Sequence, residues 1–162
     1  NATVIYEAAL NEYAPLGTEA SVTNTATVSG TGITPVTAAE TVNAEASPNL
    51  AITKSVSPVP VTENGTLTYT FRIQNYGSVA ATNTTGVVIT DTFAPVLNNL
   101  TAALNGTAWT AATDYTYNEA TGTFSSTAGA ITVPAATYTQ DSTTGAWVVT
   151  PGESTLVITG TV

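Results

Sequence analysis

The stretch Thr66–Asn75 reads Thr-Leu-Thr-Tyr-Thr-Phe-Arg-Ile-Gln-Asn, and its large apolar side chains occupy every second position. Successive side chains of an extended chain point to opposite sides of a sheet, so residues that alternate in this way share one face of a β-strand. The apolar face runs from Leu67 to Ile73, while Arg72 points to the other side. The stretch therefore predicts a half-buried strand with one face in a core.

Short alternating runs of the same kind recur along the chain, and Gly, Pro, Asn or Asp separates them. Thr is the most frequent residue, and β-branched side chains suit a pleated, half-buried surface. This spacing predicts an all-β protein with an Ig-like or Greek-key β-sandwich and no significant helix. Besides Thr66–Asn75, we expect strands at Thr3–Leu10, Ser21–Ser29, Pro35–Ala44, Asn49–Val56, Gly86–Phe93, Asn98–Leu104, Thr123–Ser126, Ala130–Val133, Ala146–Thr150 and Thr155–Val162.

Charge is scarce and one-sided, with 11 acidic residues, two basic residues and a formal net charge of −9. Phosphate binding needs clustered cations, so this balance argues against nucleic acid and against anionic lipid. The chain has no Cys and no His, which removes thiol catalysis, the commonest general base and the commonest metal ligand. We therefore expect no metal, no cofactor and no membrane span, since no apolar run reaches the roughly 20 residues that a span needs.

Residues 44–48 (Ala-Glu-Ala-Ser-Pro) look like a boundary between two structural units. We expect residues 1–46 to hold the closing strands of one repeat unit, able to serve as a donor-strand extension, and residues 48–162 to form the main β-sandwich. Thr155–Val162 also matches Thr3–Leu10 in length and inward pattern, as equivalent points of a repeating unit would. With no initiator Met and no basic leader, we expect a processed product or a segment of a longer chain.

Several short sequences after residue 48 follow one another in a characteristic order: Leu50–Val56, Asn64-Gly65, Leu67–Phe71, Ile73–Gly77, Val88–Thr92 and Ala94-Pro95. In these residues the chain resembles a repeat domain of bacterial and archaeal cell-surface proteins, a domain of unknown function related to isopeptide-forming fimbrial domains. A unit of that family closes with Asn-Thr-Ala-Thr-Val, which here is Asn24–Val28 and precedes Lys54. The resemblance implies an extracellular, cell-surface or filament location, and a main unit that lacks its own closing strands.

Alternation also places one polar residue on the apolar face of each of three expected strands. These residues and the neighbours on their faces are Lys54 with Leu50, Ile52 and Val56, Asp91 with Val87, Ile89 and Phe93, and Asn24 with Val22, Ala26 and Val28. A buried unpaired ammonium group is very costly, so Lys54 must be neutralised, paired or consumed.

Burial favours the neutral amine of lysine, which is a nucleophile. We therefore predict a single-turnover isopeptide bond between Lys54 and Asn24, with loss of ammonia and with Asp91 as the catalyst. Isopeptide-forming fimbrial domains use the same residue types, so the resemblance implies the same bond. Asn75 is a rival acceptor because it continues the inward face of Thr66–Asn75.

Two simpler interpretations of Lys54 remain open. The first is a buried salt bridge with Asp91, with Asn24 as a hydrogen-bonded core residue. The second is a lysine on an edge strand, where its charge discourages aggregation. Whether an isopeptide bond would close within one chain or between two chains is open as well.

Other candidate sites carry weaker signals. Trp109, Tyr115 and Tyr117 are candidate glycan contacts, although aromatic residues of a sandwich are more often in its core. N-glycosylation sequons lie at Asn1, Asn64, Asn83, Asn99 and Asn105.

The sequence favours a structural subunit or stalk repeat of an extracellular fibre, pilus or surface adhesin. Copies would join head to tail by donor-strand complementation, a contact that does not close and so builds a filament. The alternative is an adhesin module that binds a host or cell-surface glycan or protein through residues 105–138. An enzyme is least favoured, because no pair of acids is distinguished by its spacing.

Overall fold

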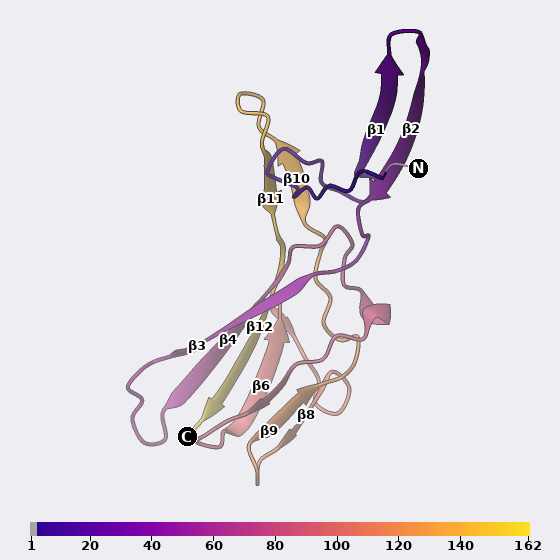
Figure 1. The fold of residues 1–162 in the computed structure, drawn as a ribbon. Helices are drawn as coiled ribbons and strands as arrows, with labels where there is room; N and C mark the ends of the chain where they lie inside the picture. The colour runs from indigo at the N-terminus through magenta and orange to yellow at the C-terminus, as the bar shows by residue number, and fades with distance from the viewer. Residues whose placement is uncertain (1–2) are drawn as a thin grey trace. The chain divides into compact units, whose positions relative to one another are not determined.

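The computed structural model describes residues 3–162, and almost all of its regular structure is antiparallel β-strand (Figure 1). Within the described residues the only helical element is η1 (Asn83–Thr85), a single turn of 3₁₀ helix. The predicted all-β class without significant helix is confirmed.

The chain divides into two compact units. Unit 1 comprises Asn1–Ala46 with Thr137–Thr150, and unit 2 comprises Ser47–Ala136 with Pro151–Val162. The change of unit after Ala46 lies at the expected boundary, but residues 137–150, expected in the main sandwich, group with unit 1. The sequon at Asn1 lies outside the described residues.

Unit 2 is an antiparallel β-sandwich of two sheets. In order, the strands of the larger sheet are β3 (Leu50–Ser57), β4 (Thr66–Asn75), β12 (Gly152–Thr161), β6 (Asn98–Leu104) and β7 (Thr107–Ala108). The strands of the smaller sheet are β5 (Thr90–Thr92), β9 (Thr123–Ser126) and β8 (Tyr115–Asn118). Both sheets therefore end in edge strands, and β12 occupies the centre of the larger one.

The core lies between these two sheets. The predicted apolar face of β4 is buried from Leu67 to Ile73, and Leu156 and Ile158 of β12 lie beside it. Phe93 and Phe124 pack against them from the smaller sheet, with their ring centroids 6.4 Å apart. The alternation in Thr66–Asn75 thus predicted the strand and its core-facing side.

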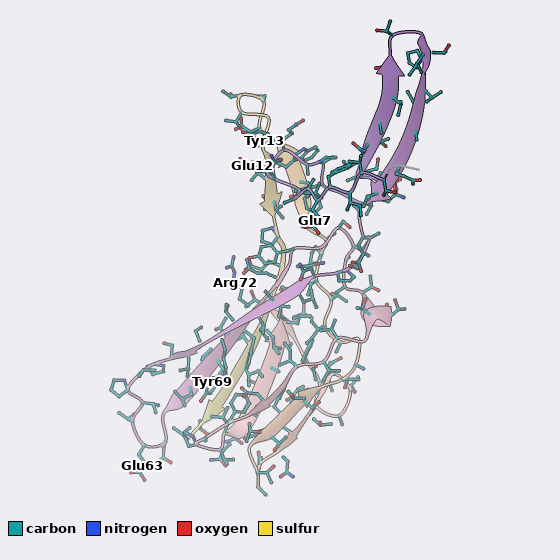
Figure 2. All side chains as sticks on the ribbon, in the orientation of Figure 1. Glu7, Glu12, Tyr13, Glu63, Tyr69 and Arg72 are labelled. Atoms are coloured by element: carbon teal, nitrogen blue, oxygen red, sulfur yellow. The ribbon has the colours of Figure 1, made fainter. Side chains whose placement is uncertain are left out.

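Unit 1 contains two hairpins, and its described residues form no buried core. One hairpin pairs β1 (Ser21–Gly30) with β2 (Ile33–Asn43), and the other pairs β10 (Thr137–Gln140) with β11 (Trp147–Thr150). None of the described residues of unit 1 is buried. The side chains of β1 and β2 stand out from their ribbon in Figure 2.

The strand predicted at Thr3–Leu10 is wrong, because this segment has no strand pairing and its apolar residues are exposed. The segment that matches it, Thr155–Val162, lies mostly within β12, where β4 and β6 hydrogen-bond to it on both sides. A strand needs neighbours to satisfy its backbone groups, and Thr3–Leu10 has none.

Three further differences concern short strands. Only Thr90–Thr92 of the expected run Gly86–Phe93 is a strand, and Ala130–Val133 contributes a single bridge, between Val133 and Ala81. The alternation missed β7, β8 and β10, each of four residues or fewer. The Asn105-Gly106 pair forms the two-residue turn between β6 and β7, where both residues have positive φ.

Candidate functional site

The sandwich of unit 2 is uncovered along one side, which we call the open edge. It consists of β3 in the larger sheet and residues 87–93, which contain β5, in the smaller sheet. β3 pairs only with β4, and β5 pairs only with β9. Lys54 of β3 contacts Asp91 of β5, so the two edge strands lie on the same side of the sandwich.

The inner face of β3 lacks a cover. Ile52, Lys54 and Val56 lie opposite the buried β4 residues Ile73, Phe71 and Tyr69 in the register of the two strands. This register places them on the core-facing side, as the alternation predicts. Nevertheless Leu50 is 37% exposed, Ile52 53% and Val56 38%. Apolar side chains on the inner face of a sandwich are normally buried by the opposite sheet. Here the smaller sheet ends at β5 and does not extend far enough to cover β3.

The backbone of the smaller sheet is also open on this side. The Ser126 N–H donates to the Ile89 carbonyl, and the Phe93 N–H donates to the Gly122 carbonyl. Backbone groups of an antiparallel strand point alternately to its two sides, so those of Val88 and Thr90 point toward the open edge. The segment is therefore a template on which another strand can pair.

An ion pair lies at the middle of the open edge. The Lys54 ammonium donates a hydrogen bond to Asp91 Oδ2, and its Nζ lies 4.8 Å from the ring centroid of Tyr69 and 5.3 Å from that of Phe93. The Lys54 side chain is 39% exposed and that of Asp91 18%. Lys54 is thus paired with Asp91 and lies on an edge strand, but the pair is only partly buried and Asn24 is an exposed residue of unit 1, not a core residue.

Asn24 lies in unit 1, on β1, where its amide donates a hydrogen bond to the Tyr6 hydroxyl. The structure thus brings Lys54 and Asp91 together and places the expected acceptor in the other unit. The Lys54–Asn24 bond stays a prediction.

The rival acceptor Asn75 is fully buried and fully hydrogen-bonded. Its Oδ1 accepts from the backbone N–H groups of Asn49 and Gly77, each at 2.9 Å. Its Nδ2 donates to the carbonyls of Val79 and Pro134, at 2.8 and 3.0 Å. Asn75 pairs with Leu50, four residues along β3 from Lys54, which corresponds to roughly 13 Å. The Asn75 amide therefore holds together the segments that contain Asn49, Gly77 to Val79, and Pro134.

A further polar residue lies on the face of the β1–β2 hairpin that carries Asn24. Glu40 of β2 lies directly opposite Asn24 in the β1–β2 register, so both side chains are on the same face of the hairpin. Glu40 alternates with Val36, Ala38 and Val42 along β2. The sequence therefore places one polar residue on an apolar face here, as it does for Lys54, Asp91 and Asn24.

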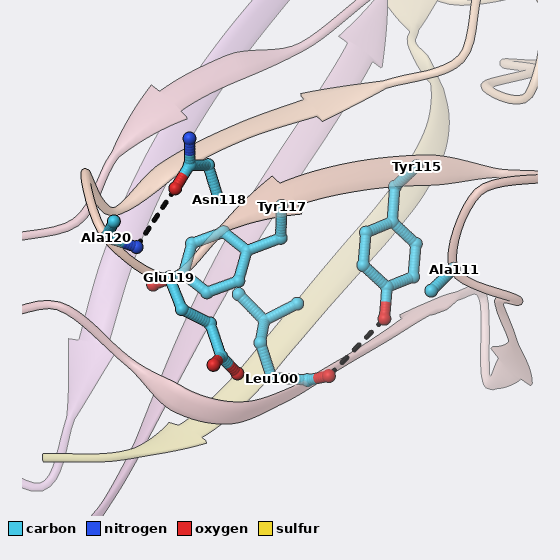
Figure 3. Close-up of a pocket in the computed structure, with 7 residues that line it drawn as sticks. All are labelled: Leu100, Ala111, Tyr115, Tyr117, Asn118, Glu119 and Ala120. Carbon is cyan, nitrogen blue, oxygen red and sulfur yellow. Dashed lines mark hydrogen bonds between the residues drawn. The ribbon is translucent and has the colours of Figure 1, made fainter.

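The aromatic residues proposed as glycan contacts are engaged in packing. Tyr115 is buried and donates its hydroxyl to the Leu100 carbonyl (Figure 3). Its ring also stacks with that of Trp109. Burial raises the pKa of Tyr115. The Tyr117 hydroxyl bonds both backbone groups of Leu97, although Tyr115 and Tyr117 also line a shallow hollow of about 640 Å³. A glycan site here stays a prediction.

Four sequons lie in the described residues. At three of them the asparagine is exposed: Asn64, Asn83 and Asn99. The fourth, Asn105, accepts from the Thr155 N–H and donates to Ser154, which occupies its amide. Glycosylation at these positions stays a prediction.

Both cations of the chain are held in ion pairs, Lys54 with Asp91 and Arg72 with Glu153. The hydrogen bond from Arg72 lowers the pKa of Glu153. In residues 3–162, no group of three or more acidic side chains is placed to hold a metal ion, and no helix is long and apolar enough to cross a membrane.

No family model matches this chain, and neither a curated protein nor a solved structure is significantly similar to it.

Proposed function

We propose that this protein is a structural module of an extracellular fibre, pilus or surface adhesin, and that copies join head to tail by strand complementation at the open edge. The observation that carries the proposal is the exposed inner face of β3 beside a free edge of β5, in a sandwich whose core is otherwise closed. A strand added there would bury Leu50, Ile52 and Val56 and would pair with the outward backbone groups of Val88 and Thr90.

The same edge supports a covalent link. Proton transfer within the Lys54–Asp91 pair leaves a neutral amine and a protonated carboxyl group. The amine attacks Cγ of an Asn24 that strand addition brings to the edge, while the Asp91 carboxyl group donates a hydrogen bond to the amide oxygen. A C–N bond to Lys54 Nζ forms, the bond to Asn24 Nδ2 breaks, and a proton from Nζ leaves with the amide nitrogen as ammonia. The step occurs once, during maturation, without turnover.

The bond is tested by intact mass and by denaturing electrophoresis after boiling. An inter-chain bond predicts a ladder of boiling-resistant species, each lighter by one ammonia per link. An intra-chain bond predicts a single monomer band lighter by one ammonia.

Three substitutions serve as controls. Lys54→Arg keeps the positive charge but removes the nucleophilic amine, Asp91→Asn removes the proton carrier, and Asn24→Ala removes the acceptor. Each should abolish the mass loss and the ladder. An unchanged mass in the wild-type chain would leave Lys54 and Asp91 as an ion pair only, and fibre assembly would then be non-covalent.

A further inference from the structure

We propose that the complementing element is the whole β1–β2 hairpin of a second copy of this chain, which docks through its even-numbered face into the open edge. This inference rests on the proposed function and names the donor, the acceptor and the register. The donor is two strands rather than one.

The β1–β2 hairpin has one apolar face and one threonine-rich face. Cross-strand pairs on the first face are Val22 with Val42, Asn24 with Glu40, Ala26 with Ala38, and Val28 with Val36. Pairs on the second face are Thr23 with Thr41, Thr25 with Ala39, and Thr27 with Thr37. A face with six apolar side chains out of eight is the pattern of a strand pair built to cover a core.

Unit 1 covers this apolar face only in part, since the Tyr6 hydroxyl accepts from the Asn24 amide and Leu10 lies beside Val22 and Val42. Val28 and Val36 are each 61% exposed and Val42 is 71% exposed. An isolated two-stranded hairpin is at best marginally stable in water, so the exposed face calls for a partner.

The smaller sheet has two strands fewer than the larger sheet, and the hairpin supplies two strands. The larger sheet has five strands and the smaller sheet has three, ending at β5. Adding β1 and β2 beyond β5 would give two sheets of five strands and would place the added apolar face opposite β3. A single added strand would extend the smaller sheet only to four.

The polar residues fix the register. Lys54, Asp91, Asn24 and Glu40 each lie on an apolar face, with apolar residues two positions before and after them. When the four strands align at these positions, the four polar side chains form one layer, in which Glu40 and Asn24 join the Lys54–Asp91 pair. A shift of two residues would bury each charge among apolar groups, which is costly.

The chain's own hairpin cannot reach this position. Residues 47–49 are fixed beside β4, because Asn49 bonds Asn75 and Tyr76, and the Gly77 backbone leaves no room beside Ser47. Only three residues, 44–46, lie between β2 and this fixed segment, and the Ala44 N–H donates to the Ala20 carbonyl. In the docked arrangement β1 pairs antiparallel with β5, which follows the direction of β3, so β2 runs along β3 and ends beside its far end. Three residues span at most about 10 Å, roughly the separation of two packed sheets, and cannot also carry the chain back along β3. The donor is therefore a second copy.

The test uses the full chain in four single variants and follows assembly by light scattering after size-exclusion chromatography. Ala26→Asp places a charge on the donor face, and Thr27→Asp is its matched control on the opposite face. Ile52→Asp damages the acceptor edge, and Thr53→Asp is its control. All four side chains are exposed in the free unit, so thermal unfolding should show that the variants remain folded.

We expect Ala26→Asp and Ile52→Asp to weaken self-association roughly a hundredfold or more, because an unpaired carboxylate would be buried at the contact. The two control variants should assemble like the wild type. A mixture of Ala26→Asp with Ile52→Asp should give a 1:1 dimer that grows no further, since one variant keeps only the acceptor and the other only the donor.

The outcomes separate the inference from the proposed function. If the wild type assembles but Ala26→Asp assembles equally well, the hairpin is not the donor and the fibre proposal stands. If the wild type stays monomeric at all concentrations, strand complementation between copies is wrong. A monomer whose β1–β2 amides resist hydrogen exchange would show closure within one chain and overturn the choice of a second copy.

Discussion

At the scale of single residues, a polar side chain on an apolar face has two different meanings in this protein. Asn75 lies on the same face as Ile73, but its amide satisfies four backbone groups from three segments and leaves no capacity for chemistry. Lys54 and Asp91 satisfy each other and remain partly exposed at an edge. The fully hydrogen-bonded Asn75 links segments of the fold, whereas the partly exposed Lys54–Asp91 pair is the one on which the proposed link depends.

Replacing Asn75 with Ala should lower the free energy of unfolding by about 3 kcal/mol, because two buried N–H groups and two carbonyls lose their partner. Urea denaturation monitored by tryptophan fluorescence measures the change. Gln74→Ala, one residue away and on the opposite face, is the control and should cost well under about 1 kcal/mol. Equal losses for both variants would contradict the role assigned to Asn75.

At the scale of elements, similar sequences form different structures according to their neighbours. Thr155–Val162 forms most of the central strand of the larger sheet, whereas Thr3–Leu10 pairs with nothing among the described residues. Periodicity shows that a segment can be a strand. Pairing partners on both sides decide whether it becomes one, since they supply the hydrogen bonds and the buried surface.

The junction between the units depends on a close backbone contact at Gly77. A Cβ atom added there would lie 2.1 Å from the Ser47 carbonyl oxygen and 2.5 Å from the Asn49 nitrogen. Gly77→Ala should therefore lower the free energy of unfolding by about 2 to 4 kcal/mol, as backbone must move to make room.

Gly86→Ala is the comparison for Gly77→Ala, because a Cβ at Gly86 meets nothing within 4 Å although φ is +69°. It should cost only about 1 kcal/mol, from the left-handed backbone conformation. Thermal or urea unfolding of both variants tests the difference. A smaller effect at Gly77 than at Gly86 would show that residues 47–49 are not fixed beside β4.

At the scale of the whole molecule, each copy carries a formal net charge of −9, so copies brought into a fibre repel one another. The contact proposed at the open edge is largely apolar and is less sensitive to salt. Raising the ionic strength from about 0.01 to 0.15 M shortens the screening length from roughly 30 to 8 Å. Self-association should therefore strengthen over this range.

Sedimentation velocity at fixed protein concentration and increasing NaCl measures this effect. Sodium sulfate at matched ionic strength should strengthen assembly further, because it favours apolar burial. Assembly that weakens steadily with NaCl would show that attractive ion pairs dominate the contact, which contradicts the open-edge arrangement.

Alternation alone determined the all-β class, the core face of β4 and the apolar strand faces on which Lys54, Asp91 and Asn24 lie, because side-chain direction in a strand follows from position parity. Alternation also places Glu40 on an apolar face of its strand. Alternation did not predict the short strands β7, β8 and β10, because two to four residues are too few to establish a period.

Only the tertiary structure decided which strands became edges. It paired Lys54 with Asp91, left the inner face of β3 exposed, committed the Asn75 amide to four backbone groups and set Glu40 beside Asn24. The physical reason is that burial and pairing depend on neighbours far along the chain. The sequence assigns a side chain to a face of its strand, but the packing of the sheets decides whether that face is covered.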